Sequence, residues 1–421
     1  MSNENNKSAL RRRSFLVGSA GAIGIGCGAA DSEFGDVDDE NVEALEQAIT
    51  GGQVIVSRNK AFDENVRSVV NKAGGVGAFI NRDDVVVLKP NGQWKWHGYT
   101  HTGCMKALID MILAYKWPAG GFTGEILIAE HVHRTPDLAM SDSYCWNMSV
   151  ANRKYNWPTQ HYNGLVAAYR NAGKRVAAVP LYDVEENPTK WASATGPGNL
   201  PTGKNGWVRT TYRTVATNNK VVRLSHPLIR SPFAASNIID LNRGLVWKAG
   251  AYSAQKVKLI FLPTLNNHYN TNPGTPFEDY SGATSAVKCH LGIVEFKPNT
   301  AGTLNLHQIG FNTDPAKNRP DAVGESIGHL ITNILRPTFY MTCAEYVGYQ
   351  ARCSGAAART NTVGLSLDPV SLDFWMCKNV LFPVDTRYTF FDPSRANNLR
   401  KMLAACHAKG VGTLNPSVVY A

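Results

Sequence analysis

The chain has 421 residues, a formal net charge of +10 and a hydrophobic fraction of 43%. This basic balance favours an anionic partner. No stripe dense in Lys and Arg and interleaved with aromatic residues is present, so nucleic acid is not expected as a partner, and neither an internal repeat nor a low-complexity tract is evident.

The first 30 residues have the features of an export signal. Three arginines at 11–13 precede Ser14, Phe15 and Leu16, and a small, weakly apolar run follows at 17–30. This pattern resembles a twin-arginine signal, which directs folded proteins, often with a cofactor already inserted, through the twin-arginine translocation machinery. The run is shorter than the roughly 20 apolar residues of a transmembrane helix. We expect a periplasmic or cell-envelope protein; the alternative is a disordered basic tail.

Two cleavage hypotheses remain open. The small residues Gly28, Ala29 and Ala30 suit a signal peptidase that releases the protein. Gly26-Cys27 followed by acidic residues resembles a lipoprotein site, and lipidation of Cys27 is the one route by which we expect contact with a membrane. Residues 31–46 contain eight acids and no base, so the rest of the chain is more basic than the whole. We interpret residues 31–52 as an acidic tether.

Strands and helices alternate along the remaining sequence. The predicted strands are 54–57, 85–88, 125–129, 176–179 and 257–262, and the predicted helices are 62–72, 102–115, 164–171, 322–335 and one after Asp368. Such alternation predicts an α/β fold, a mostly parallel sheet flanked by helices on both faces. We expect 53–421 to form a single large domain with an irregular insertion near 185–212, which is rich in Pro, Gly, Thr and Asn.

The ends of these elements are rich in chemically active side chains. In a parallel α/β sheet the ligand pocket lies beyond the carboxyl ends of the strands, where loops and helix N-termini meet. Polar, aromatic and metal-capable residues are dense in four such segments: 89–101, 130–133, 263–268 and 368–373. The sequence therefore predicts a pocket at this edge of the sheet.

Three motifs in these segments resemble signatures of the domain-of-unknown-function 362 family. They are Val-Val-Leu-Lys-Pro-Asn at 86–91, Leu262-Pro263 leading to His268 with Gly-Ala-Thr-Ser-Ala-Val-Lys at 282–288 and Gly292, and Asp-Pro-Val-Ser-Leu-Asp at 368–373. The resemblance runs in the family's order from about residue 54 to 381. It departs from the family pattern at Asn266, where lysine is usual, and at Cys289, where asparagine is usual.

The motif residues supply our catalytic candidates: Lys89, Asn91, His268, Lys288, Asp368 and Asp373. Lys89 at a strand end suits a phosphate or carboxylate, and Asn91 offers a donor and an acceptor to orient it. The alternative is that Lys89 pairs with a structural acid and Asn91 fixes a turn. Asp368 before Pro369 is typical of a helix N-cap, and the competing hypothesis makes Asp368 or Asp373 a cation ligand or a base.

Histidines at the same edge suggest a metal. His97 and His101 would share a face with Cys104 if helical, while His131 and His133 would point the same way from a strand. Either set suits zinc, copper or iron. The alternative is that these are hydrogen-bonded loop residues without a metal.

Cysteines and aromatic residues leave further alternatives. No Cys-x-x-Cys pair occurs, so an iron-sulfur cluster is not expected. Cys343 and Cys353 are the first pair to test for a disulfide. Cys289, between Lys288 and His290, is either an activated thiolate or a buried inert thiol. An aromatic cluster at 94, 96 and 99 suits either stacking on a sugar or packing in a core.

These observations predict an exported enzyme, with or without a metal, that acts on an anionic small molecule through an unspecified reaction. The alternative is a non-catalytic periplasmic binding protein for an anion, a sugar or a metal. The twin-arginine signal establishes neither, because it concerns the route of export and not the chemistry.

Overall fold

The structure, a computed structural model, describes residues 51–421 except 93–94, 133–135, 158–159, 183–204, 216–220, 269–281, 296–302, 305, 307–308, 310–318 and 351–355. The expected signal peptide, nearly all of the acidic tether, and the residues Trp94, His133 and Cys353 lie outside the described part. The described residues belong to one compact unit. None of the described helices is both long enough and apolar enough to cross a membrane.

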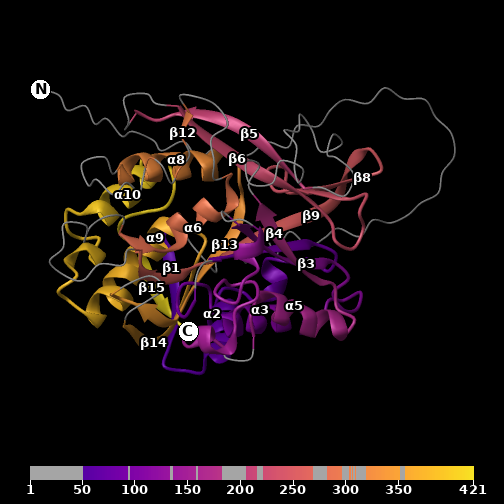
Figure 1. Cartoon of the computed structure of the whole chain (residues 1–421), viewed down its shortest axis with the longest axis horizontal. Coiled ribbons are helices and arrows are strands. Elements are labelled where there is room, and N and C mark those ends of the chain that lie inside the picture. Colours follow the sequence, from indigo (N-terminus) through magenta and orange to yellow (C-terminus); the bar gives the residue numbers. More distant parts are fainter. Residues whose placement is uncertain are drawn as a thin grey trace, which may run out of the picture. The chain divides into compact units, whose positions relative to one another are not determined.

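Parallel strands form the centre of a 15-stranded sheet (Figure 1). They are arranged in the order β4 (Val176–Tyr182), β3 (Glu125–Val132), β2 (Val85–Pro90), β9 (Ala251–Leu262) and β13 (Pro337–Gly348). Every residue of β2 is buried, as expected for a strand covered on both faces. The carboxyl ends of these strands therefore share one edge.

The sheet continues beyond β13 with a change of direction. The strand β14 (Ala357–Ser366) is antiparallel both to β13 and to β1 (Gln53–Arg58). The last strand, β15 (Ser417–Tyr420), is parallel to β1. Because two antiparallel steps restore the direction, β1 runs the same way as β13, and Arg58 lies at the edge where the parallel strands end.

An antiparallel meander pairs with the first half of β9, before the part of β9 that pairs with β2. It consists of β5 (Gly206–Arg213), β6 (Val221–Arg230), β7 (Ile238–Asp240) and β8 (Leu245–Lys248), paired in that order and ending on β9. Positive φ angles at Ala249 and Gly250 form the tight turn between β8 and β9. The short strands β10 (Thr264–Asn267), β11 (Ala283–Thr284) and β12 (Thr303–Leu304) complete the sheet.

The predicted fold class, a mostly parallel sheet flanked by helices, is therefore wrong: the sheet is large and mixed. The sequence predicted no element between 180 and 256 and an irregular insertion at 185–212, whereas β5 and β6 form a long antiparallel pair. Composition misled the prediction, because Thr and Asn in 206–220 are typical of a loop, whereas residues 224–229 of β6 are all buried.

Helices cover both faces of the central strands (Figure 1). On one face α2 (Phe62–Lys72), α3 (Thr102–Ala114) and α5 (Tyr162–Asn171) pack against a core that contains Val86 and Leu88. The opposite core contains Val85 and Val87, since neighbouring strand residues point to opposite faces. The helices on that side are α6 (Ala286–Cys289), α8 (Pro320–Asn333), α9 (Pro369–Met376) and α10 (Asn398–His407).

Short helical turns connect these elements. They are α4 (Pro136–Ala139), η1 (Val76–Ala78), η2 (Val150–Arg153), η5 (His290–Ile293), the π-helical turn η7 (Cys377–Leu381), η8 (Phe382–Val384) and η9 (Thr389–Phe391). The turn η5 follows α6 directly and contacts the end of β3. It thereby brings the second sequence motif to the edge where β2 and β3 end.

Candidate functional site

A buried ion pair lies where β2 and β3 end. Lys89 Nζ is 2.5 Å from Glu130 Oε2, and Lys89 and Glu130 are 0% and 4% exposed. The parallel register aligns Leu88 with Ile128, which brings the following residues of the two strands to the same level. Two neighbouring strands thus deliver opposite charges to one point of the edge.

The ammonium of Lys89 has a partner for each of its three hydrogens. It donates to Glu130 Oε2, to Pro90 O at 2.6 Å and to Cys289 Sγ at 3.4 Å. These contacts agree with the second hypothesis for Lys89, in which it pairs with a structural acid of the protein. An anionic ligand that binds Lys89 directly has to displace one of these partners.

Burial sets the protonation of the cluster formed by Lys89, Glu130 and Cys289. It raises the pKa of the Glu130 carboxyl to about 7, because the loss of hydration outweighs the attraction of Lys89. Burial also raises the pKa of the Cys289 thiol to about 12 despite the nearby Lys89. Cys289 is therefore a neutral thiol near pH 7, as the inert alternative requires, while Glu130 is able to exchange a proton there.

Two glycines allow the backbone to close over this cluster. A Cβ atom on Gly92 would lie 2.2 Å from Glu130 Cγ, and one on Gly292 would lie 2.1 Å from Glu130 Oε1 and 2.6 Å from Lys89 Nζ. All three distances are shorter than those of real Cβ atoms, so a side chain at either position would displace Glu130 or Lys89. Gly292 belongs to the second sequence motif, so its lack of a side chain has a local steric reason.

Asn91 connects three segments at the edge of the sheet through hydrogen bonds. Its Oδ1 accepts a hydrogen bond from Thr264 N at 3.3 Å, its N donates to Thr100 Oγ1 at 2.8 Å, and its carbonyl accepts from Tyr162 at 2.7 Å. Asn266 likewise donates to His97 O and accepts from Gly348 N, both at 2.6 Å. These amides join neighbouring segments.

The two predicted carboxylates accept hydrogen bonds at the starts of two different helices, α9 for Asp368 and α6 for Asp373. Asp368 caps α9 by accepting from Val370 N at 2.8 Å, and it also accepts from Thr413 N at 2.9 Å. Asp373 accepts from Ser285 Oγ at 2.7 Å and from the first amides of α6, Ala286 N and Val287 N. Burial raises the pKa of Asp373 to about 7 in spite of these donors. Capping is thus the observed role of both residues.

The remaining catalytic candidates, His268 and Lys288, belong to the second motif. His268 Nδ1 is 2.9 Å from Thr284 Oγ1, and Lys288 is buried in α6. The structure brings all three motifs together, since Lys89 of the first contacts Cys289 beside the second, while Asp373 of the third holds the start of α6.

The metal candidates occupy separate places. His101 is the N-cap of α3, where its Nδ1 accepts from Gly103 N and its ring packs on Phe62. The rings of His97 and His131 lie against Tyr155 and Trp207 respectively. Because α3 begins at Thr102, His97 does not share a helix face with His101. Among the described residues, no group of three or more His, Cys, Asp or Glu side chains is arranged to hold a metal.

Glu130 is the main functional candidate that the sequence analysis did not select. Glu130 lies one residue after a predicted strand, as Lys89 does after another, and this position was the sequence feature that indicated a role. The pairing of Glu130 with Lys89 could be predicted only with the parallel register of β2 and β3. His290, which with His268 was a candidate to complete a metal site, is buried, and its nitrogens lie 2.9 Å from Val287 O and 3.2 Å from the Tyr340 hydroxyl.

Comparison with known proteins gives no relative: no family model, curated protein or solved structure matches the chain. The family resemblance therefore remains a prediction from the three sequence motifs.

Proposed function

We propose that the protein is an exported enzyme that acts on an anionic small molecule at the edge where β2, β3 and β9 end. The observation that carries the proposal is the buried pair of Lys89 and Glu130, beside the neutral thiol of Cys289. Charged groups with shifted pKa values at the carboxyl edge of parallel strands are typical of catalytic sites.

Within this site, Glu130 is the proton-transferring group. A carboxyl with a pKa of about 7 takes up and releases protons at neutral pH. Lys89 is a positioning residue, because its donors hold Glu130 Oε2 and the Pro90 carbonyl in place. A change at Lys89 should therefore alter the pH dependence of the reaction as well as its rate.

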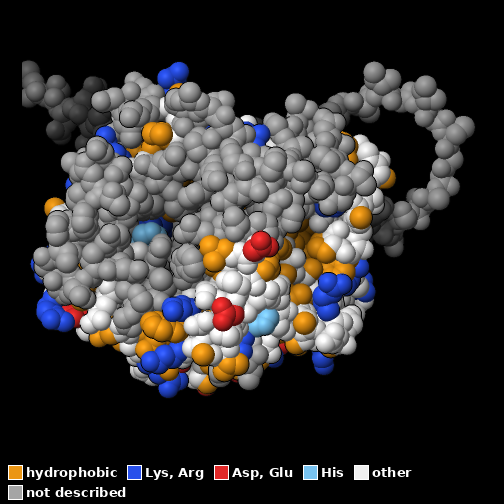
Figure 2. Space-filling model, in the orientation of Figure 1, with side chains coloured by type: hydrophobic (Ala, Val, Ile, Leu, Met, Phe, Trp, Pro, Cys, Tyr) orange, Lys and Arg blue, Asp and Glu red, His pale blue; other side chains and the backbone are white. Residues whose placement is uncertain are grey.

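Net charge supports an anionic substrate in a general way. The whole chain carries +10, and on the face drawn in Figure 2 the described Lys and Arg side chains lie in several separate groups. Such a distribution raises the local concentration of anions around the molecule without marking one binding site. The site assignment therefore depends on the Lys89 and Glu130 pair.

The three converging motifs also support membership of the domain-of-unknown-function 362 family, as part of this proposal. Asp373 connects the third motif to the second through Ser285, and Cys289 connects the second to Lys89 of the first. This chain of contacts links the three motifs, although Asp368 lies at the opposite edge of the sheet, where β1 begins.

The first experiment uses protein purified from its native host. Elemental analysis and an absorbance spectrum determine whether a metal or chromophore is bound. Inorganic phosphate, succinate and citrate are then added, and thermal unfolding shows which of them stabilises the protein. The stabilising probe is incubated with the protein and followed by NMR for conversion. An enzyme converts it; stabilisation without conversion indicates the binding protein.

Matched variants locate the site. Lys89→Met combined with Glu130→Gln removes both charges and keeps similar volumes, and it should abolish conversion. Lys258→Met is the control, because Lys258 pairs with Asp84 at 3.8 Å near the start of β2, at the opposite end of that strand from Lys89. If the double variant converts the probe at the wild-type rate, the site is elsewhere.

Export is tested separately. Replacing Arg12 and Arg13 by lysine should leave the precursor in the cytoplasm, because the twin-arginine machinery recognises the arginine pair. Cell fractionation with antibody detection measures this. Normal export of the variant would contradict a twin-arginine signal, whereas the proposed site would be unaffected.

A further inference from the structure

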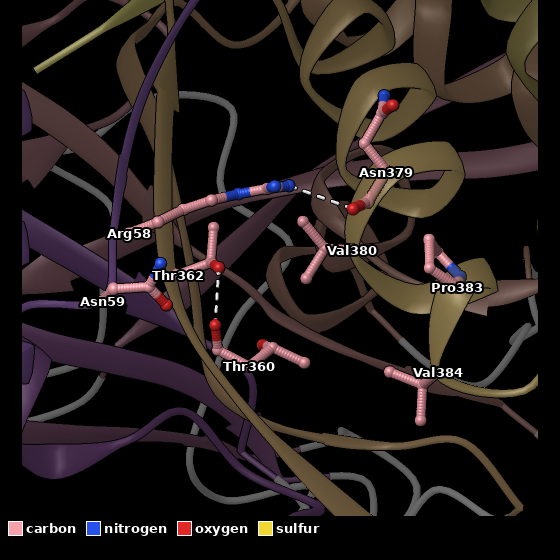
Figure 3. Close-up of a pocket in the computed structure, with 8 residues that line it drawn as sticks. All are labelled: Arg58, Asn59, Thr360, Thr362, Asn379, Val380, Pro383 and Val384. Atoms are coloured by element: carbon pink, nitrogen blue, oxygen red, sulfur yellow. Dashed lines mark hydrogen bonds between the residues drawn. The ribbon is translucent and has the colours of Figure 1, made fainter.

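A hollow lies at the same edge of the sheet, where β1 ends (Figure 3). It has a volume of about 260 Å³ and is lined by eight residues from β1, β14, η7, η8 and the residue after β1: Arg58, Asn59, Thr360, Thr362, Asn379, Val380, Pro383 and Val384. Arg58 is paired with Thr362 across the sheet. The hollow therefore lies between the paired strands β1 and β14 on one side and the turns η7 and η8, which follow α9, on the other.

Arg58 brings a positive charge to this hollow that no described carboxylate neutralises. Its Nη2 donates to the carbonyl of Asn379 at 2.9 Å, and its guanidinium carbon lies 4.8 Å from the centre of the Trp375 ring. Its Nε is buried and has no acceptor among the described residues. A guanidinium with five donors is thus matched by a single neutral acceptor and a ring.

The other walls divide into a polar and an apolar part. On the strand side the hydroxyls of Thr360 and Thr362 donate to the carbonyls of Ala344 and Thr360. Figure 3 shows Val380, Pro383 and Val384 opposite these threonines, on the side of η7 and η8. A ligand that suits these walls has one anionic end and a short apolar body.

We propose that this hollow binds a small organic carboxylate, whose carboxylate group pairs with Arg58 and whose carbon chain lies against Val380 and Val384. Arg58 is the only charged residue among the eight that line it, which matches a single negative charge better than a phosphate dianion. Arg and carboxylate groups form strong charge-assisted pairs. The volume lies just below the usual range of ligand pockets, about 300 to 1,000 Å³, and so limits the ligand to a few carbon atoms.

The site is distinct from the Lys89 cluster. In the sheet order, β9, β13 and β14 separate β2 from β1, and four steps at about 4.8 Å place the two sites roughly 19 Å apart. Asn379, which accepts from Arg58, belongs to the π-helical turn η7, a conformation frequent at functional sites. The inference does not require the proposed function of the Lys89 site.

The test measures binding by isothermal titration calorimetry with butyrate, acetate, inorganic phosphate and butyramide. Butyramide has nearly the shape of butyrate without its charge. We expect butyrate to bind more tightly than acetate, and butyramide to bind at least about tenfold more weakly than butyrate. Equal affinity for butyrate and butyramide, or tighter binding of phosphate, would overturn the proposal.

Two variants assign the binding to the hollow. Arg58→Gln should weaken butyrate binding at least about tenfold, whereas Arg387→Gln, which changes an exposed arginine paired with Asp385, should leave it unchanged. Val384→Phe fills the hollow from its apolar wall while Arg58 stays in place, and should also abolish binding. Unchanged butyrate affinity in Arg58→Gln or in Val384→Phe would show that the carboxylate binds elsewhere.

Discussion

At the scale of single residues, Lys89 and Glu130 show how the protein keeps charge in its interior. Each charge lost its hydration on folding, and the contact at 2.5 Å together with the bonds of Lys89 to Pro90 and Cys289 compensates for that loss. Removing one partner leaves the other charged group buried without a partner. Removing both eliminates the desolvation penalty of the two charges together with their attraction.

The variant Lys89→Met should accordingly lower the free energy of unfolding by about 3–5 kcal/mol. The double variant Lys89→Met with Glu130→Gln should lose clearly less. Urea unfolding at pH 7.5 measures both. Lys106→Met is the control, because Lys106 and Asp110 form a pair at 2.5 Å on the surface of α3, with side chains 39% and 42% exposed. Additive effects of the two substitutions would contradict this account of the pair.

At the scale of elements, glycines set the close approach of α8 and α10. A Cβ atom on Gly324 would lie 2.0 Å from the carbonyl oxygen of Met402, and one on Gly328 would lie 2.9 Å from that of Cys406. The two helices therefore meet backbone to backbone. This contact covers the face of the sheet opposite α2 and α3, and the packing of α8 depends on the absence of two side chains.

The variant Gly324→Ala should separate these helices. Overpacking of this kind costs about 1–3 kcal/mol, which exceeds the gain of about 1 kcal/mol in helix propensity. Gly164→Ala in α5 is the matched control, because its nearest neighbour would be the flexible end of Gln160 at 3.2 Å; it should be neutral or stabilising. Thermal unfolding compares the two, and a more stable Gly324→Ala protein would contradict the backbone contact.

At the scale of the whole molecule, buried ionisable groups give stability two opposing dependences on pH. Burial lowers the pKa of His290 from 6.5 to about 3, so the unfolded chain binds an extra proton between these values and stability falls as the pH falls. Burial raises the pKa of Glu130 and Asp373 to about 7. The folded state binds the extra protons there, so their contribution is present at low pH and is lost as the pH rises to 7.

Replacing His290 by Gln should isolate the first dependence. The variant cannot take up a proton, so its free energy of unfolding should fall less steeply than that of the wild type between pH 6.5 and 3, even if the variant is less stable overall. Urea titrations across this interval measure the difference. His407→Gln, at the exposed end of α10, is the control. Parallel curves for wild type and His290→Gln would exclude His290 as the source.

Much of the local structure follows from the sequence. The buried run at 85–88 and the helix expected at 102–115 correspond to β2 and α3, because continuous apolar runs and helical spacing report burial directly. Asp368 before Pro369 marked the start of α9 for the same local reason. The strand-end rule correctly placed the segments of Lys89 and Glu130 at one edge of the sheet. It was wrong for Asp368, which follows the antiparallel strand β14 at the opposite edge.

The tertiary structure decided what the sequence left open. Only the register of β2 and β3 shows that Lys89 meets Glu130, and only the position of α6 shows that Asp373 caps it. Strand direction beyond β13 and the antiparallel meander of β5 to β8 depend on long-range pairing, which no local pattern encodes. Burial patterns arise within a few residues, whereas partners and strand directions arise between residues far apart in the chain; the sequence by itself therefore determined elements and candidates, and the fold determined their contacts.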